Sequence, residues 1–296
     1  MSKNEHVLTQ VGENTFFIKG ETNIGVYVRQ DGSAVVIDTG FAPMGEEIDR
    51  LISDAGMKPA YILNTHSHRD HMDGNTYLMD KYRISAYCSR YEILFDEYPD
   101  LEPAFFFGGY PEKRLLQMFG HEKSCGLKPI SESSAEKDGI EIIDVPGHSP
   151  GMIGFMTPDK VWFLGDAYLG LGYLKNHRFG YMYRVDEFLR TLEKISELKG
   201  RAFIPGHGRM EENVSETIEA NRRNVREQLE MIEAVCEHPA GFDEITGVMS
   251  REYRLPEDVG FYAMQSTNIR SMLSYLEDRG RVGRIYQDGI VKWQCK

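Results

Sequence analysis

The N-terminal part of the chain alternates between apolar and polar positions with the two-residue period that is typical of β-strands. Three short runs show this pattern, and glycine-containing turns separate them: 15–18, 25–28 and 34–37. From residue 43 the period changes to that of an α-helix, with Ile48, Leu51 and Ile52 on one face of a predicted helix over 43–55. Strand-like and helix-like segments then alternate as far as residue 207, which predicts an α/β architecture.

The later elements of this alternation are short apolar strands and amphipathic helices. The predicted strands are 61–65, 140–145, 161–164 and 202–204, and the predicted helices are 73–82 and 185–198. A chain of 296 residues, with 41% hydrophobic and 27% charged residues, is expected to form one large or two modest packed domains.

Residues 90–130 break the pattern because they are rich in aromatic side chains. Phe105, Phe106, Phe107 and Tyr110 lie near the middle of this stretch. An aromatic segment inserted between strands predicts a cap over a site, in which these four side chains would line an apolar substrate pocket. A packed connection, or a contact between the subunits of a homodimer, explains the same residues equally well.

Residues 211–296 have the pattern of an appended C-terminal domain, which divides the chain into 1–210 and 211–296. The segments that predict this domain are two helices, 214–236 and 267–278, and a hairpin over 281–293 with an Asp-Gly turn. A helix that leads directly into a hairpin is the pattern of a winged helix. The C-terminal region is therefore predicted to be small, mainly helical and winged-helix-like.

The charge of the chain is strongly negative, at −12. This balance argues against a protein that binds nucleic acid nonspecifically. Residues 268–296 differ, because their lysines and arginines give them a net charge of +3. A solvated face is the simpler explanation of this basic segment, and binding of nucleic acid is the alternative.

The sequence carries no sign of a membrane or export segment. No apolar run is long enough to span a bilayer, and the first ten residues lack the apolar core of a signal peptide. The four cysteines, at positions 88, 125, 236 and 295, have no metal-ligand spacing and are interpreted as buried or incidental thiols. These features predict a cytoplasmic protein.

Residues 65–71, Thr-His-Ser-His-Arg-Asp-His, concentrate candidate metal ligands. Three of the nine histidines of the chain fall in this stretch, together with Asp70. Imidazole nitrogen and carboxylate oxygen are the ligands that zinc and its first-row neighbours prefer. In an extended segment His66, His68 and Asp70 point the same way, whereas His71 begins the next helix and points elsewhere. This geometry favours two metals, with His66 and His68 on one and Asp70 and His71 on the other.

Three later strands each end in a turn that is rich in glycine or proline and contains one histidine or aspartate. These turns are Pro-Gly-His148-Ser-Pro-Gly, Gly-Asp166-Ala and Pro-Gly-His207-Gly. Each residue alone is best explained as an ordinary turn residue. Together with residues 65–71 they predict loops that converge on one site at the edge of a sheet.

These motifs, in this order and together with Val-Val-Ile-Asp38-Thr-Gly, resemble those of the metallo-β-lactamase fold superfamily. The resemblance implies an α/β fold, a four-layer αβ/βα sandwich with a metal site at the sheet edges. It also implies a ligand set: His66, His68 and His148 for a first metal, Asp70, His71 and His207 for a second, and Asp166 bridging both. In the family Asp38 supports the ligands by hydrogen bonding, although a turn residue after a strand is the alternative.

The bridging position distinguishes branches of this superfamily. Asp166 stands where many antibiotic-hydrolysing members with two zinc ions have a cysteine, so the sequence is more similar to the glyoxalase II, lactonase and nuclease branches. A C-terminal winged helix is known in one branch, which includes single-strand RNA endonucleases and thioester hydrolases. A structural cap or a dimer surface is our preferred interpretation of the extension here.

The favoured function is a dinuclear metal-dependent hydrolase that attacks an ester, thioester or lactone with a metal-bridging hydroxide. Asp70 would also accept a proton, and Tyr168, just past Asp166, would help to hold the oxyanion. His177, on the same loop as Tyr168, would reach the substrate. Zinc is the expected metal, with iron or manganese as alternatives.

Two other functions are consistent with the same residues. One is a metal-dependent endonuclease of single-stranded RNA, in which aromatic residues of the cap would stack on bases. The other is a binding or regulatory protein that keeps the metal site without turnover. The negative charge counts against the first and the complete ligand set against the second, so a small-molecule substrate is the expected partner.

Overall fold

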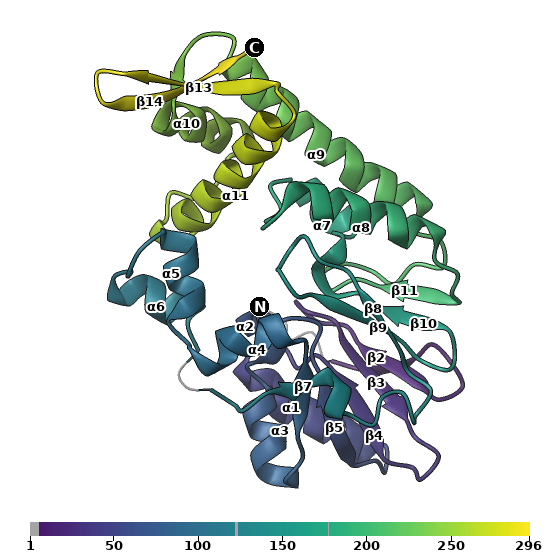
Figure 1. Ribbon diagram of the computed structural model, residues 1–296. Helices are drawn as coiled ribbons and strands as arrows, with labels where there is room; N and C mark the ends of the chain where they lie inside the picture. The colour runs from purple at the N-terminus through teal and green to yellow at the C-terminus, as the bar shows by residue number, and fades with distance from the viewer. Residues whose placement is uncertain (1–5, 122–123, 177) are drawn as a thin grey trace.

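A computed structural model describes residues 6–121, 124–176 and 178–296, and Figure 1 shows their arrangement. Two β-sheets lie face to face, and helices cover the outer face of each. The first sheet has seven strands in the spatial order β1-β2-β3-β4-β5-β6-β7, and the second has four in the order β11-β10-β9-β8. This arrangement confirms the four-layer αβ/βα sandwich.

The strands are short and follow the apolar runs of the sequence. Those of the first sheet are β1 (Leu8–Gln10), β2 (Thr15–Ile18), β3 (Ile24–Val28), β4 (Ala34–Ile37), β5 (Pro59–Leu63), β6 (Ala86–Cys88) and β7 (Lys128–Pro129). Those of the second sheet are β8 (Glu141–Asp144), β9 (Ile153–Met156), β10 (Val161–Phe163) and β11 (Ala202–Ile204).

Helices connect and cover the strands up to the end of the second sheet. The α-helices of this part are α1 (Ala42–Asp54), α2 (Arg69–Met72), α3 (Asn75–Tyr82), α4 (Arg90–Glu97), α5 (Leu101–Phe107), α6 (Lys113–Phe119), α7 (Leu171–Asn176) and α8 (Val185–Glu197). Two 3₁₀ turns, η1 (Ile130–Glu132) and η2 (Gly165–Ala167), follow strand ends.

Strand β4 illustrates why the layers form. All four of its residues are buried, because its two faces meet different layers of the sandwich. Val35 belongs to the core cluster between the sheets, together with Phe155 of β9. Val36 belongs to the cluster on the outer face, together with Ile48 of α1. On the other side of the molecule, Phe188 of α8 shares a cluster with residues of the second sheet.

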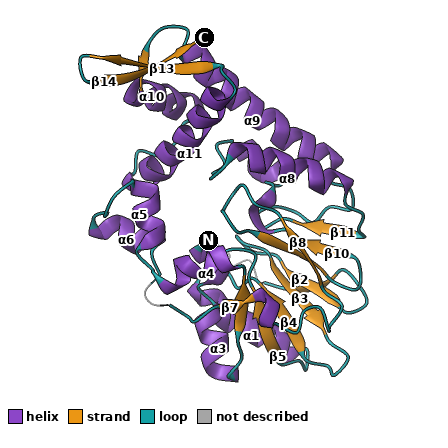
Figure 2. Ribbon diagram, in the orientation of Figure 1, coloured by secondary structure: helices purple, strands orange, loops and turns teal. Residues whose placement is uncertain are grey.

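The C-terminal region consists of α9 (Ser215–Val235), α10 (Phe242–Tyr253), α11 (Val259–Asp278) and a small sheet of β12 (Ala240–Gly241), β13 (Val282–Gln287) and β14 (Ile290–Cys295). Figure 2 shows the long helices α9 and α11 meeting near the hairpin. One continuous core cluster runs from Val145 to Val282, so this region packs against the α8 side of the sandwich. The division of the chain at residue 210 and the winged-helix assignment stay predictions.

The sequence prediction of this region needs two corrections. Helix α10 was not predicted, and α11 begins at Val259, well before the predicted start at residue 267. Asp258 marks the true start, because its Oδ1 accepts a hydrogen bond from Gly260 N at 2.8 Å. The predicted hairpin is confirmed: Asp288 and Gly289 form its two-residue turn, with φ of 51° and 77°.

Residues 90–130 form helices α4, α5 and α6 before the chain enters β7. Figure 1 shows α5 and α6 beside the N-terminal end of α11, and Thr267 Oγ1 of α11 donates to Phe106 O of α5 at 2.7 Å. The inserted segment thus joins the C-terminal region. Among the described residues, no helix is both long and apolar enough to cross a membrane.

Candidate metal centre

The candidate ligands come together because strand ends of both sheets meet at one edge. Strands β10 and β11 are parallel, and β9 is antiparallel to both β8 and β10, so β8, β10 and β11 run in the same direction. His148, Asp166 and His207 follow the ends of these three strands. His66 and His68 follow the end of β5 in the first sheet. The predicted convergence is therefore what the fold produces.

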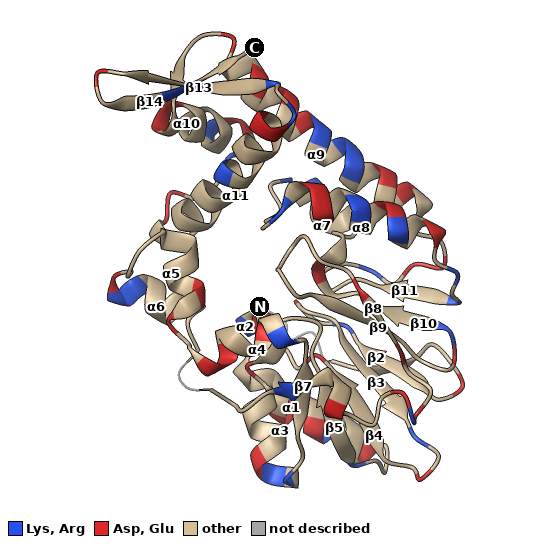
Figure 3. Ribbon diagram, viewed as in Figure 1, with Lys and Arg blue, Asp and Glu red and all other residues tan. Residues whose placement is uncertain are grey.

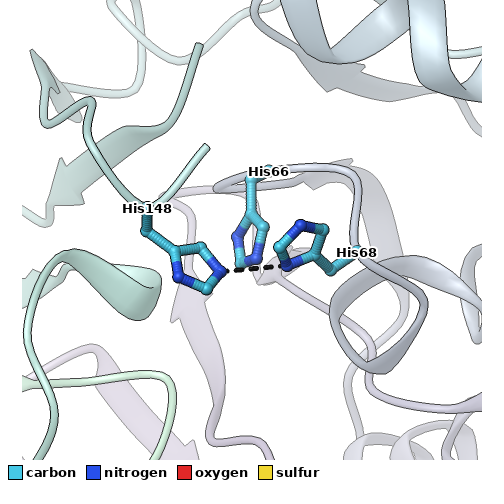
Figure 4. A group of neighbouring side chains, drawn as sticks. All are labelled: His66, His68 and His148. Carbon is cyan, nitrogen blue, oxygen red and sulfur yellow. Dashed lines mark hydrogen bonds between the residues drawn. The ribbon is translucent and has the colours of Figure 1, made fainter. Parts of the chain in front are cut away.

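The first ligand group contains His66, His68 and His148, whose ring nitrogens lie within 4.8 Å of one another. Figure 4 shows the three rings directed toward a common point, with His148 Nε2 and His68 Nδ1 2.9 Å apart. Nitrogen ligands of a tetrahedral zinc ion lie roughly 3.3 Å apart, given bonds of about 2.0–2.1 Å. The spacing of this group fits such an ion.

The second ligand group contains Asp70, His71 and His207, again with ligand atoms within 4.8 Å of one another. Asp70 Oδ2 lies 3.1 Å from His207 Nε2 and 3.7 Å from His71 Nε2. The sequence prediction placed Asp70 in an extended segment, which is wrong: α2 begins at Arg69 and contains both Asp70 and His71. The helical turn brings these two residues to the same group.

Asp166 lies between the two groups. One carboxylate oxygen is 3.4 Å from both His148 Nε2 and His207 Nε2, and the other is 3.5 Å from His71 Nε2. A side chain at Gly206 would collide with Asp166, which explains the glycine before His207. Asp166 therefore has the position that a bridging ligand requires.

Several ligand atoms are buried without a hydrogen-bond partner in the described part of the chain: His66 Nε2, His71 Nε2 and Asp166 Oδ1. Buried polar atoms normally have a partner, because leaving one unpaired costs about 1–3 kcal/mol. A metal ion bound by these atoms would satisfy all three. The residues present thus fit bound divalent metal.

The surroundings shift the pKa values of the histidines in opposite directions in the two groups. Burial lowers the pKa of His68 to about 3 and holds the pKa of His66 well below its usual value. Burial also acts to lower the pKa of His71, but the carboxylates of Asp70, Asp166 and Asp38 outweigh it and raise the pKa to about 10. The first group therefore offers neutral imidazoles, whereas the second holds protons between its carboxylates.

Hydrogen bonds fix the orientation of most ligand rings. Asp38, with φ of 56°, accepts from His71 Nδ1 at 2.9 Å and from Thr65 N and Oγ1 at 2.8 Å each. The Nδ1 atoms of His148 and His207 lie 3.1 Å and 2.7 Å from the carbonyl oxygens of Tyr181 and Glu21. A carboxylate or carbonyl behind each ring is the usual way to orient metal-binding histidines. Asp38 thus lies where the predicted supporting residue should be.

A cavity of about 500 Å³ adjoins both ligand groups. His68, His148, Asp70, His207 and Asp166 form part of its wall. The remaining wall is largely apolar and comes from the inserted segment, the loop after η2, α9 and α11; it includes Phe106, Phe119, Leu169, Tyr173, Phe179, Tyr181, Val225, Phe261 and Met264.

Only one of the four aromatic residues predicted to line this pocket does so. Phe106 lines the cavity, but Phe105 lies only against a small neighbouring hollow. Phe107 and Tyr110 are 53% and 75% exposed, because α5 turns just one face inward and Tyr110 follows its end. His177, the other predicted substrate contact, lies outside the described residues.

The structure does not bring Tyr168 to the cavity. Its side chain is fully buried in the core cluster that contains α8 and α9, and its hydroxyl has no hydrogen-bond partner among the described residues. Tyr173 of helix α7 lines the cavity instead. Its ring stacks on that of His207, with 5.1 Å between the ring centroids. The segment after η2 thus does supply a tyrosine to the cavity wall, but from helix α7.

Sequence reasoning also missed two buried carboxylates of the inserted segment. Glu102 Oε1 of α5 lies 3.4 Å from His68 Nε2, behind the ring nitrogen that faces away from the first group. Burial raises the pKa of Glu102 well above its usual value. Glu92 of α4 accepts hydrogen bonds from the loops beside His66, His68 and His148. Neither residue belongs to a motif. For Glu102 the one signal was a lone acid in the mostly apolar α5, and α4 gave no such signal for Glu92.

Comparison with known proteins agrees with this geometry. Residues 19–207 match the model of the metallo-beta-lactamase superfamily. The beta-lactamase-like protein 2 homolog of Drosophila melanogaster is 24% identical over 94% of this chain and 87% of its own length. A hydroxyacylglutathione hydrolase of Brucella canis is 27% identical, but the match covers 56% of this chain and only 55% of that protein.

The crystal structure of a beta-lactamase domain protein from Burkholderia ambifaria has the same fold, with a TM-score of 0.74 at 19% identity. The likeness covers 98% of this chain and 93% of that one, so it includes the C-terminal region. Because the family model spans more than half of the chain and includes all the candidate ligands, the protein belongs to the metallo-beta-lactamase superfamily and is a hydrolase of that superfamily.

Proposed function

We propose that the protein is a dinuclear metal-dependent hydrolase of an ester, thioester or lactone. The observation that carries this proposal is that two ligand groups share Asp166 in the wall of one mainly apolar cavity. Hydrolysis of a carboxylic ester bond needs a water nucleophile and a stabilised oxyanion. Two divalent metal ions, usually zinc in this superfamily, would supply both when bound.

The side chains of this chain would orient the reaction. Asp70 lines the cavity with its side chain 24% exposed, so its carboxylate is accessible to accept a proton beside the reacting carbonyl. Tyr173 lies against His207 in the same wall and is our candidate for the hydrogen-bond donor to the oxyanion, in place of Tyr168. The apolar wall excludes water from the remainder of the substrate.

The cavity favours a substrate with an apolar acyl group. Phe106, Tyr181 and Met264 bring aromatic and aliphatic surface from three segments of the chain to the same cavity. A thioester of glutathione, suggested by the name of the Brucella relative, would also need cations for its carboxylates. Arg254 is exposed at the cavity wall, and no ion pair of its side chain occurs within the described residues, so it is the cation best placed for such an anion.

The test is hydrolysis by the purified protein after loading with zinc, manganese or iron. The panel contains glutathione thioesters, aryl esters and lactones, each with a short and a long apolar acyl group. We expect two metal ions per chain and turnover that rises with acyl length. Asp166→Asn should abolish turnover, whereas Asp54→Asn, at the exposed end of α1, serves as the matched control. Full turnover by Asp166→Asn with two bound metals would contradict the mechanism.

Cleavage of single-stranded RNA remains the second candidate, and one observation favours it. Tyr91, Tyr98, Phe107 and Tyr110 of the inserted segment are all more than half exposed, as residues that stack on bases would be. All four arginines of the basic C-terminal segment are engaged within the molecule, which counts against RNA cleavage. Arg281 and Arg284 pair with Glu233 and Glu277, and Arg270 and Arg279 lie over aromatic rings.

Figure 3 shows acidic and basic residues interspersed along α9 and around the C-terminal hairpin, rather than a band of one sign. The metal-loaded protein should therefore leave a labelled single-stranded RNA intact at low salt. Cleavage that is lost in His66→Ala and weakens steeply with salt would favour the nuclease function instead.

A further inference from the structure

Glu92 is a completely buried carboxylate that is not among the candidate metal ligands. It lies in the first turn of α4, and its side chain has no exposed surface. Its Oε2 accepts hydrogen bonds from Ser67 N at 3.0 Å and Ser67 Oγ at 2.7 Å. Its Oε1 accepts from Ser149 Oγ and from Gly151 N, both at 2.8 Å. One carboxylate therefore receives four hydrogen bonds.

The partners of Glu92 come from the two loops that carry the first ligand group. Ser67 lies between His66 and His68, and Ser149 follows His148 directly. The first loop leaves the first sheet after β5, and the second leaves the second sheet after β8. Both oxygens of a single rigid carboxylate thus hold loops from different sheets at a fixed separation.

The hydrogen bonds of Glu92 are of the strong kind. A carboxylate that accepts from N–H and O–H donors forms bonds roughly twice as strong as those between neutral groups. Ser67 is held from its other side as well, because His121 Nε2 lies 3.0 Å from Ser67 O. The backbone between His66 and His68 is therefore fixed by two residues of the inserted segment.

The second ligand group receives no such contact. The four donors to Glu92 flank only the histidines of the first group, whereas His71 is held by Asp38 and His207 by Glu21 O. An effect that passes through Glu92 should therefore be confined to one group.

We propose that Glu92 is a positioning residue for the first metal, which sets the distance between the His66–His68 loop and His148. This inference rests on the proposed metal centre. It assigns to the inserted segment a role beyond covering the cavity. Loss of a residue that orients metal ligands typically costs about 10–100-fold in metal affinity.

The test is the metal affinity of Glu92→Gln, which keeps the shape of the side chain but replaces one acceptor by an NH₂ donor. Zinc affinity is measured by competition with a chelator in two backgrounds. His207→Ala leaves the first group intact, and His148→Ala leaves the second. We expect Glu92→Gln to lower the affinity about 10–100-fold in the His207→Ala background and to leave it unchanged in the His148→Ala background.

Three further variants make this test selective. Glu97→Gln changes an exposed glutamate of the same helix and should alter neither affinity. Ser149→Ala removes one of the four donors to Glu92, so it should fold even if Glu92→Gln does not. It should lower the zinc affinity of the first group alone. Ser67→Ala should have an effect that is not additive with Glu92→Gln, because both variants disrupt the same contact.

The outcomes separate this inference from the proposed function. Equal affinity in Glu92→Gln and its parent at the first group would overturn the positioning role, as would an equal loss at both groups, which indicates a general packing role. If Glu92→Gln does not fold, an unchanged zinc affinity of the first group in Ser149→Ala would overturn the positioning role. Failure of the unmodified protein to bind two metals would instead overturn the proposed function.

Discussion

The two ligand groups lie side by side, yet different parts of the chain hold them. Around the first group, Glu102 lies behind His68 and Glu92 fixes the loops, and both glutamates come from the inserted segment. Around the second, Asp38 follows β4, and the carbonyl of Glu21 precedes β3, so the support comes from the N-terminal strands. His66 of the first group is the exception, because its Nδ1 lies 3.0 Å from Oγ1 of Thr65, which donates to Asp38. The second group is thus held by the N-terminal strands, whereas the first depends in part on an insertion.

The electrostatics of the two groups differ in the same way. The first group has three histidines whose pKa burial lowers, so they are neutral and able to accept a metal at neutral pH. The second group contains a carboxylate of its own and shares Asp166, and its histidines keep protons until a metal displaces them. Because Glu92 and Glu102 contact only the first group, substitutions in the inserted segment should change the first metal site more than the second.

The strongest test of this division removes one ligand from each group. His148→Ala and His207→Ala should each retain one metal per chain and lose most of their turnover, because the proposed reaction uses both metals. Metal content per chain and kcat measure the effect. If either variant lost both metals, the two groups would form a single cooperative unit and the comparison would fail.

Asp38→Asn should act selectively on the second group. The substitution removes the charge behind His71 Nδ1 but keeps an oxygen that can accept from Thr65 N. We expect a loss of about 10–100-fold in affinity for the second metal, measured in the His148→Ala background. The affinity for the first metal, measured in the His207→Ala background, should fall much less. An equal loss in both backgrounds would mean that Asp38 acts mainly through Thr65 and the loop that carries His66.

The stability of the metal-free protein should depend on pH in opposite ways through the two groups. The pKa of His68 is lowered to about 3, so its contribution is complete above its usual pKa of about 6.5 and is lost as the pH falls below it. The pKa of His71 is raised to about 10, so its contribution is complete below about 6.5 and is lost as the pH rises toward 10. Each of these two histidines contributes a slope of roughly 1.4 kcal/mol per pH unit within its window.

Urea unfolding of the metal-free protein at pH 5, 6.5 and 9 measures these slopes. The free energy of unfolding should be highest near pH 6.5. His68→Gln should reduce the slope on the acid side, and His71→Gln should reduce it on the alkaline side. If both variants flattened the same side, the assignment of neutral and protonated histidines to the two groups would be wrong.

The ligands could be predicted from the sequence because strand ends and turn residues are local signals. His148, Asp166 and His207 each follow an apolar run directly, and the sandwich brings such ends to one edge. Asp70 does lie beside His71, but not for the reason that the sequence suggested, because the chain turns into α2 immediately after His68. A helix of only four residues is too short to show a helical period in the sequence.

The residues that surround the ligands could not be predicted in this way. Whether Phe106 or Phe107 faces the cavity depends on how α5 packs against α11, which lies far away in the sequence. Glu92 would be expected at the surface, because a charged residue in a short helix usually is. Its burial becomes intelligible only when four donors from two distant loops surround it.

The smallest predicted difference is between two tyrosines of neighbouring segments, Tyr168 directly after η2 and Tyr173 in α7. Tyr168 buries an unpaired hydroxyl in the core, so Tyr168→Phe should leave kcat unchanged and should keep or slightly raise the free energy of unfolding, by up to about 1 kcal/mol. Tyr173 stacks on His207 beside the second group, so Tyr173→Phe should lower kcat about 100-fold if its hydroxyl donates to the oxyanion. Both variants keep the ring, which limits the difference to one oxygen atom. A larger loss of kcat in Tyr168→Phe than in Tyr173→Phe would show that the loop takes a different conformation during turnover, with the buried tyrosine facing the substrate.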